Sequence, residues 1–301
     1  MRVIIDFDGT LTAEERQARA LAEKSIGTLA NEIINAPHEE LAGRYDATRA
    51  RLLKNPHRYW WEVNGLIASY CDEGAFILNT TTLQVMLRET EPYRRAVEVA
   101  FSEAEYDPVV DCTNYLFHRH TAELPPVFRP VSQEVLSALA RRPNRDPVIL
   151  TNSLGDKVRR HLRTLDLEEP VAILGDTRQY DMDPDWTRRF HHPELGEIQI
   201  WPISGLRQVD LRRPIYYDAL VDALEEDPQV VVVADTFSLP GALPLMMGLH
   251  FLLVRTSYTP DWCAETVASH PRGSVLDNLA DLPSALDEIE PEKLQSSEVG
   301  S

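Results

Sequence analysis

Several common features are scarce in this 301-residue chain, and each shortage narrows the range of protein classes to which it can belong. The three cysteines, Cys71, Cys112 and Cys263, are odd in number and lack metal-ligand spacing, which excludes a disulfide scaffold and indicates a reducing compartment. No apolar run reaches about 18 residues, the length that a membrane-spanning helix needs. The first strand-like run begins at Arg2 and leaves no room for a secretion signal, so we expect a cytoplasmic protein.

Positive charge is also scarce, because 30 Lys and Arg stand against 48 Asp and Glu and give a net charge of −18. A surface this acidic repels phosphate backbones and anionic lipids, so we expect neither nucleic acid nor a membrane as a partner. A small anionic substrate is not excluded, since a bound metal or a few arginines can reverse the field inside one cleft. The oligomeric state cannot be inferred from the sequence.

What the chain does contain is a set of short, continuous apolar runs separated by helical patterns. These runs are VII at 3–5, PVIL at 147–150, PVAIL at 170–174, VVVVA at 230–234 and LHFLLV at 249–254. Continuous rather than alternating hydrophobicity is typical of parallel strands that are covered on both faces. The helical patterns lie at 131–142, 156–165 and 216–226. We therefore predict an α/β fold with a doubly wound parallel sheet and a Rossmann-like core, whose ligand crevice lies at the carboxyl ends of the strands.

The segment 14–126 contains no comparable strand and is dense in helix-forming residues. We predict that it is an all-helical insert in a core formed by 1–13 and 127–285. The expected helices lie near 14–35, 38–54, 57–71, 79–89, 92–104 and 108–120. The remaining segment, 286–301, is acidic and rich in serine, and we expect a flexible tail there.

Two carboxylates follow the first predicted strand, because Asp6 and Asp8 flank Phe7 and precede Gly9 and Thr10. At this spacing the first acid can face a substrate and a metal. The backbone carbonyl of the second can bind Mg²⁺, and its side chain can transfer a proton. Asp-Gly is also an ordinary turn signal, but a turn alone explains neither the two acids nor the threonine.

The run VIIDFDGTLT resembles the first motif of the haloacid dehalogenase superfamily, most of whose members are phosphatases. The resemblance implies that Asp6 is a nucleophile that forms an aspartyl-phosphate with the help of Mg²⁺. It implies that Asp8 is the general acid for the leaving alcohol and later the base for water. An acid at position 8 argues against the dehalogenase branch, whose members lack it. We also place Thr10 among the substrate-binding residues.

The second motif of that family, a strand ending in Thr or Ser, is matched by ILTNS at 149–153. The resemblance implies that Thr151 holds a phosphoryl oxygen and that Asn152 assists it at the start of the following helix. The alternative is that Thr151 only caps that helix.

The third motif is a lysine placed before the helix that precedes the fourth strand, and the sequence departs from it. None of the four lysines, which are Lys24, Lys54, Lys157 and Lys293, lies in that segment. Arg213 stands there instead, before Pro214. Arginine can neutralise phosphoryl oxygens bidentately, so we predict that Arg213 is catalytic. The alternative is a surface arginine before a helix that begins with proline.

The fourth motif supplies acids for the metal, and here Asp235 follows the strand while Leu239 occupies the position of a second acid. Mg²⁺ can be bound through one or two carboxylates, so we predict Asp6, Asp8 and Asp235 as its ligands. The spacing of Asp176 and Asp181 matches the motif better, but the order of the strands favours Asp235.

The insert follows the first motif directly, where many members of the family carry a helical lid that selects the substrate. Within the run FHRHT at 117–121 we predict substrate contacts from His118 and Arg119. The expected function is that of a Mg²⁺-dependent phosphatase acting on a small phosphorylated metabolite. A phosphotransferase, a phosphonate-cleaving enzyme and an inactive ligand-binding relative remain as alternatives.

Overall fold

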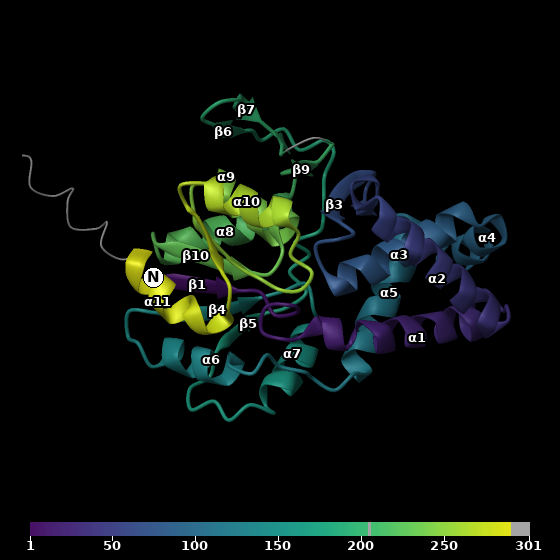
Figure 1. The fold of residues 1–301 in the computed structure, drawn as a ribbon, viewed down its shortest axis with the longest axis horizontal. Helices are drawn as coiled ribbons and strands as arrows, with labels where there is room; N and C mark the ends of the chain where they lie inside the picture. The colour runs from purple at the N-terminus through teal and green to yellow at the C-terminus, as the bar shows by residue number, and fades with distance from the viewer. Residues whose placement is uncertain (204–205, 290–301) are drawn as a thin grey trace, which may run out of the picture.

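A parallel six-stranded sheet forms the centre of the computed structural model, which describes residues 1–203 and 206–289 (Figure 1). The strands follow the order β12-β11-β10-β1-β4-β5. Their bounds are β1 Arg2–Ile5, β4 Asp146–Leu150, β5 Ala172–Leu174, β10 Val230–Ala234, β11 His250–Val254 and β12 Gly273–Leu276. All five predicted strands are present and parallel, which confirms the predicted α/β fold, and β12 is a further strand that we did not predict.

Helices cover both faces of the sheet, with α8, α9 and α10 on one face and α6, α7 and α11 on the other (Figure 1). Successive residues of a strand point to opposite faces, and accordingly Ile4 and Ile5 of β1 are buried in two different cores. Burial on both faces explains why the strands are continuously apolar. The helices are α6 Ser132–Ala140, α7 Gly155–Leu162, α8 Pro214–Glu226, α9 Ala242–Met246, α10 Asp261–Ser269 and α11 Leu282–Ile289.

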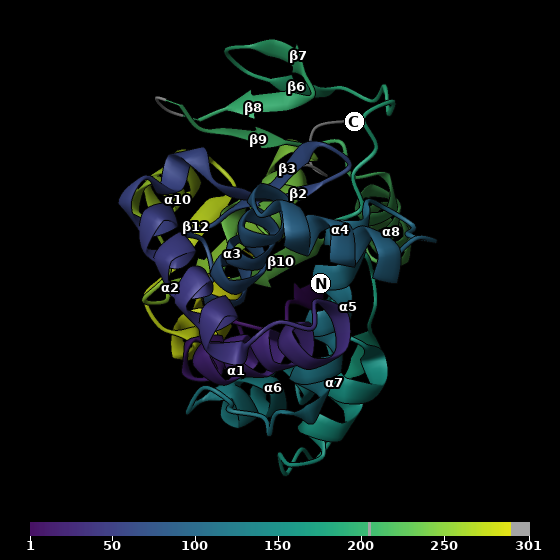
Figure 2. The same ribbon diagram turned by 90° about the vertical axis from the view of Figure 1, so that its right-hand side faces the viewer.

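The insert after β1 contains five α-helices that pack around an apolar core of their own, beside the carboxyl ends of the strands (Figure 2). They are α1 Ala18–Thr28, α2 His38–Lys54, α3 Ala75–Glu89, α4 Glu91–Ala100 and α5 Pro108–Glu123. Short 3₁₀ or π-helical turns are η1 Glu14–Arg16, η2 Leu29–Ile33, η3 Pro56–Arg58, η4 Phe237–Gly241 and η5 Leu279–Asp281. The expected helices lie close to these bounds, with one exception.

The helix expected at 57–71 was wrong, because this segment forms a β-hairpin of β2 Trp60–Val63 and β3 Leu66–Tyr70. The insert is therefore not all-helical. Its turn is made by Asn64 and Gly65, which have φ of 52° and 76°. Asn-Gly accepts positive φ at both positions and is flanked here by aromatic and β-branched residues, which is a strong hairpin signal.

Two further hairpins interrupt the core between β5 and α8 and were not predicted. They pair β6 Phe190–His192 with β7 Gly196–Ile198, and β8 Ile200–Pro202 with β9 Gln208–Asp210. The second hairpin lies beside the hairpin of the insert, where Gln208 donates its backbone N–H to the Tyr70 hydroxyl at 3.0 Å (Figure 2).

The segment expected as a tail begins in a helix, since 286–289 belong to α11 and Leu286 is buried. The rest of that expectation, 290–301, lies outside the described residues. Among the residues that the structure does describe, no helix is long and apolar enough to cross a membrane.

The β2–β3 hairpin is fixed to the core by two completely buried charged groups, Glu73 and Arg213, which we call the hairpin anchor. Glu73 follows β3 and accepts hydrogen bonds from the backbone N–H of Tyr70 at 2.9 Å and of Ser238 at 2.7 Å. Arg213, at the start of α8, donates to the carbonyl of Ala68 in β3 at 2.6 Å. The anchor thus joins the hairpin to the segments that follow β10 and precede α8.

Candidate active site

Four acidic side chains line one cavity between the insert and the carboxyl ends of the strands; they are Asp6, Asp8, Glu14 and Asp235. Asp6 and Asp235 follow β1 and β10, which are neighbours in the sheet, so both side chains emerge at the same edge. Gly9 has a φ of 81°, and a Cβ atom there would lie 2.2 Å from Asp235 Oδ2. The turn after Asp8 therefore requires glycine for its conformation and for space.

Burial and mutual repulsion raise the pKa of three of these carboxyls. Asp6 remains partly accessible from the cavity, yet desolvation and the charge of Asp8 raise its pKa well above the ordinary value. Desolvation and then the charge of Asp235 raise the pKa of Glu14. The pKa of Asp235 is raised by desolvation and then by the charge of Asp6. We call the four acids the cavity floor, which thus carries more negative charge than its surroundings neutralise.

Thr10, predicted to contact substrate, instead holds Asp235. Its hydroxyl donates to Asp235 Oδ1 at 3.1 Å and accepts from the Asp235 backbone N–H at 3.0 Å. Thr10 is fully buried and is not among the described residues that line the cavity. The threonine of the first motif therefore fixes the orientation of a floor carboxylate.

Glu14 is a cavity residue that sequence reasoning missed. Its Oε1 accepts hydrogen bonds from the backbone N–H groups of Ala75 at 2.5 Å and Phe76 at 3.2 Å, at the N-terminus of α3. A carboxylate at this position stabilises the helix, since the free N–H groups and the helix dipole both favour negative charge. Because this contact is between residues about 60 apart in sequence, the run TAEER carried no sign of it.

Lys157 is the lysine of the site, and its position was not predicted. It lies on α7 with its Nζ 3.0 Å from both carboxylate oxygens of Asp8 and 2.7 Å from Ser153 Oγ. The Ser153 hydroxyl also donates to Asp8. Two of the four lysines lie in the insert and one lies in the C-terminal segment, so Lys157 is the one lysine left in the predicted core. Its place in the site could have been inferred on that ground.

Arg213, predicted to face the nucleophile, lies elsewhere. Its guanidinium donates to three backbone carbonyls, those of Ala68, Gln179 and Ser238, and burial lowers its pKa to about 10. It is not among the described cavity-lining residues. The local match to the third motif was therefore misleading, because Arg213 serves the hairpin anchor.

Thr151 and Asn152 line the cavity, as predicted. The Thr151 hydroxyl accepts from the Ser153 backbone N–H at 3.1 Å, which leaves its own proton free for a ligand. Asn152 Oδ1 accepts from the Gln179 backbone N–H at 2.7 Å, so its amide group is held with the NH₂ available.

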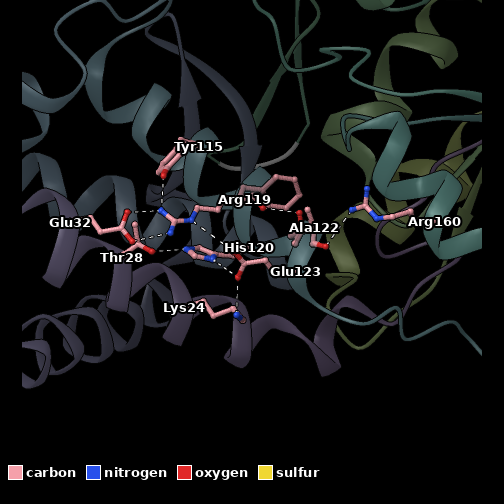
Figure 3. Close-up of polar contacts among 11 residues, drawn as sticks. Lys24, Thr28, Glu32, Tyr115, Arg119, His120, Ala122, Glu123 and Arg160 are labelled. Atoms are coloured by element: carbon pink, nitrogen blue, oxygen red, sulfur yellow. Dashed lines mark hydrogen bonds and ion pairs between the residues drawn. The ribbon is translucent and has the colours of Figure 1, made fainter.

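The structure places the two substrate contacts predicted in the insert, His118 and Arg119, in different surroundings. His118 lines the cavity, and burial lowers its pKa. Arg119 instead binds Glu32 at 2.7 and 2.9 Å and the Tyr115 hydroxyl at 2.6 Å, within a polar network that joins α1, η2 and α5 (Figure 3). Asp176 and Asp181 are not among the described residues that line the cavity, while Leu239 is.

A divalent metal was predicted on Asp6, Asp8 and Asp235. No group of three or more His, Cys, Asp or Glu side chains within 1–203 and 206–289 has the arrangement of a ready-made metal centre. The predicted set differs from such a centre, since it combines two carboxylates with the Asp8 carbonyl. These hard oxygen donors fit Mg²⁺, which needs few protein ligands.

Comparisons with models of protein families and with curated proteins found no match to this chain. Among solved structures, HAD-hydrolase YfnB from Bacillus subtilis, bound to magnesium, is 13% identical with a TM-score of 0.48, over 95% of this chain and 98% of that one. CbbY from Rhodobacter sphaeroides in complex with phosphate is 16% identical with a TM-score of 0.47, over 95% and 98%. A 2-haloacid dehalogenase from Pseudomonas syringae is 17% identical with a TM-score of 0.42, over 96% and 98%. Since likenesses at this level are weak, the function proposed below rests on residues of this chain.

Proposed function

We propose that this chain is a member of the haloacid dehalogenase superfamily and a Mg²⁺-dependent phosphatase for small phosphate monoesters. The observation that carries the proposal is the pair of Asp6 and Asp8 at the end of the central strand, with Asp8 held by Lys157 and Ser153. Such a pair offers a carboxylate nucleophile beside a positioned proton donor.

In the proposed reaction a carboxylate oxygen of Asp6 attacks phosphorus, and the bond to the leaving oxygen breaks while Asp8 protonates that oxygen. The resulting Asp8 carboxylate is stabilised by Lys157, and the Thr151 hydroxyl donates to a phosphoryl oxygen. Asp8 then removes a proton from the water that cleaves the aspartyl-phosphate. A divalent cation held by Asp6, Asp235 and the Asp8 carbonyl would offset the negative charge of the floor and of the phosphate.

We propose that the insert acts as the lid of this site. Residues of α3 and α5, including Phe76 and Phe117, line the same cavity as the four acids. A cover of this kind excludes water from the first step and admits it for the second.

The second candidate is a dehalogenase, which the name of one similar structure suggests. The presence of a second acid, Asp8, at the cavity favours the phosphatase, because a leaving alcohol requires a proton whereas displacement of a halide does not. The two candidates therefore differ in whether Asp8 has a task.

Release of phosphate from an aryl phosphate, with and without Mg²⁺, tests the proposal. We expect metal-dependent turnover that Asp6→Asn reduces by about 10⁴-fold or more, the scale on which loss of a covalent nucleophile acts. Asp222→Asn, which alters an exposed acid on α8, is the matched control and should behave as wild type. Equal rates for wild type and Asp6→Asn would rule out the assignment. Halide release from 2-chloropropionate without phosphate release would favour the dehalogenase.

A further inference from the structure

The cavity lining combines two kinds of side chain. The floor is formed by the four acids described above. Most of the other lining residues are neutral and aromatic or aliphatic, and we call this neutral set the wall. Its members are Trp61, Phe76, Ile77, Thr80, Asn114, Phe117, Tyr180, Thr236 and Leu239. In the proposed reaction the acids act on the metal and on phosphorus, so the wall is the part left to contact the leaving group.

Two pairs of aromatic rings belong to this wall. Trp61 of the hairpin and Tyr180 of the core have ring centroids 5.1 Å apart. Phe76 of α3 and Phe117 of α5 meet edge to face at 5.7 Å. Flat apolar groups gain from such surroundings through burial of area and through ring contacts.

Leu239 extends the apolar wall across the seam between insert and core. It stands where the haloacid dehalogenase superfamily has a second acid. Its side chain is 5% exposed and packs in one cluster with Tyr180 and Met182 of the core. The same cluster includes Val63 and Val110 of the insert. The departure from the family pattern therefore replaces a charge by apolar surface at the cavity.

Among the described residues that line the cavity, none is lysine or arginine, and burial disfavours the charged form of His118 by lowering its pKa. The Lys157 ammonium lies 5.7 Å from the centre of the Phe117 ring, but it is already hydrogen-bonded to Asp8 and Ser153. Two arginines near wall residues have acidic partners: Arg178, which lines an adjoining pocket with Asn114 and Tyr180, pairs with Glu105, and Arg119 pairs with Glu32. A carboxylate or second phosphate on the leaving group would be buried there without a cation, which is costly.

We propose that the substrate is a phosphate monoester whose leaving group is uncharged and aromatic, of the aryl or arylalkyl class. This inference rests on the proposed function, since it concerns the leaving-group side of the same site. The wall disfavours bisphosphates and phosphorylated carboxylic acids, because its own residues offer no cation and Lys157 is already paired with Asp8.

Three esters of primary alcohols with similar intrinsic reactivity test the inference: 2-phenylethyl phosphate, glycerol 3-phosphate and 2-(4-carboxyphenyl)ethyl phosphate. We expect kcat/KM to be about 100-fold higher for the first than for either of the others, a difference that corresponds to about 2.7 kcal/mol. Equal or reversed preference, with phosphate release that depends on Asp6, would overturn the inference and leave the proposed function intact.

Placing a cation on the wall should change this preference. In Thr80→Lys, on the half-buried part of α3, the ratio of kcat/KM for the carboxylated ester to that for 2-phenylethyl phosphate should rise at least about tenfold. Val99→Lys adds the same charge on α4 at a position that is 80% exposed, and it should leave the ratio unchanged. An unchanged ratio in Thr80→Lys would contradict the inference.

A binding measurement tests the preference of the wall independently of catalysis. Calorimetry with Asp6→Asn and Mg²⁺ should show 2-phenylethyl phosphate binding about 10-fold or more tightly than glycerol 3-phosphate. That result supports the preference of the wall even if the wild type releases no phosphate, an outcome that would reject only the proposed function. Tighter binding of glycerol 3-phosphate would overturn the inference.

Discussion

Two groups of charged side chains in this molecule, the hairpin anchor and the cavity floor, differ in what surrounds them. In the hairpin anchor, Glu73 and Arg213 have opposite signs, and each has several hydrogen-bond partners from the backbone. In the cavity floor, like charges meet, and burial together with mutual repulsion raises the pKa of Asp6 and Asp235. The anchor charges are therefore satisfied within the chain, while among the four floor acids the structure pairs Asp8 with a cation, Lys157, and within 1–203 and 206–289 shows no such ion pair for Asp6, Glu14 or Asp235.

This difference separates structural from functional charge without reference to motifs. A buried charge whose hydrogen bonds are all made within the chain has little left to offer a substrate. Carboxyls that repel one another at the mouth of a crevice are instead typical of sites that bind cations or transfer protons. Arg213 therefore belongs with the structure, whereas Lys157 is assigned to the site because its partner Asp8 lines the cavity.

The largest effect is expected from breaking the anchor. Arg213→Met leaves three carbonyls without a donor and Glu73 without a buried cation nearby, so the free energy of unfolding should fall by about 3–5 kcal/mol. Denaturant unfolding measures this change. Arg163→Met, which alters an exposed arginine after α7, is the control and should unfold as wild type does. A variant as stable as wild type would show that the anchor is not structural.

A smaller effect, on rate rather than stability, is expected from Lys157→Met. Asp8 would lose its cation, so kcat should fall by about 10²- to 10³-fold, which corresponds to about 2.7–4 kcal/mol of transition-state stabilisation. Phosphate release under saturating Mg²⁺ measures it, with Lys24→Met in the insert as control. Loss of stability with unchanged kcat would place Lys157 with the anchor rather than with the site.

The smallest effect is a gain of stability in the metal-free protein. The pKa of Asp235 is raised above its ordinary 3.8, so between about pH 4 and the raised value the folded chain holds a proton that the unfolded chain releases. The free energy of unfolding of wild type therefore falls as pH rises through this window, whereas that of Asp235→Asn does not. We expect equal stability near pH 4 and a gain of about 1 kcal/mol at pH 7 in the variant.

Thermal unfolding with a chelator, across pH 4–7, measures this gain. Saturating Mg²⁺ should cancel it, because a cation that binds the folded wild type stabilises that protein and not the variant. Asp222→Asn should show no such dependence on pH, since Asp222 is exposed. A variant that is less stable than wild type at pH 7 would mean that Asp235 is already neutralised within the chain.

The sequence predicted those features that depend on local pattern. Continuous apolar runs located the parallel strands, and strand ends located Asp6, Thr151 and Asp235 at one cavity. The hairpin at 60–70 is also marked locally, by Asn64-Gly65, although it lies within a segment of helical composition.

The remaining features depend on which distant segments meet, and no local pattern carries that information. Arg213 occupies the expected place in the chain, yet the segment before α8 faces the hairpin carbonyls. Lys157 reaches Asp8 because α7 packs beneath the turn after β1. Glu14 enters the cavity through its contact with the N-terminus of α3, which is defined only by the packing of the insert.

The hairpin anchor also restricts how ligands can come and go. The insert is joined to the core at its two chain crossings, where the Ala13 backbone N–H donates to the Val127 carbonyl at 2.7 Å, and again through Glu73 and Arg213. A body held at two separated places cannot swing freely about either one. We therefore expect product to leave through local displacement of α3 and α5 rather than through rotation of the whole insert, with the hairpin remaining docked during turnover.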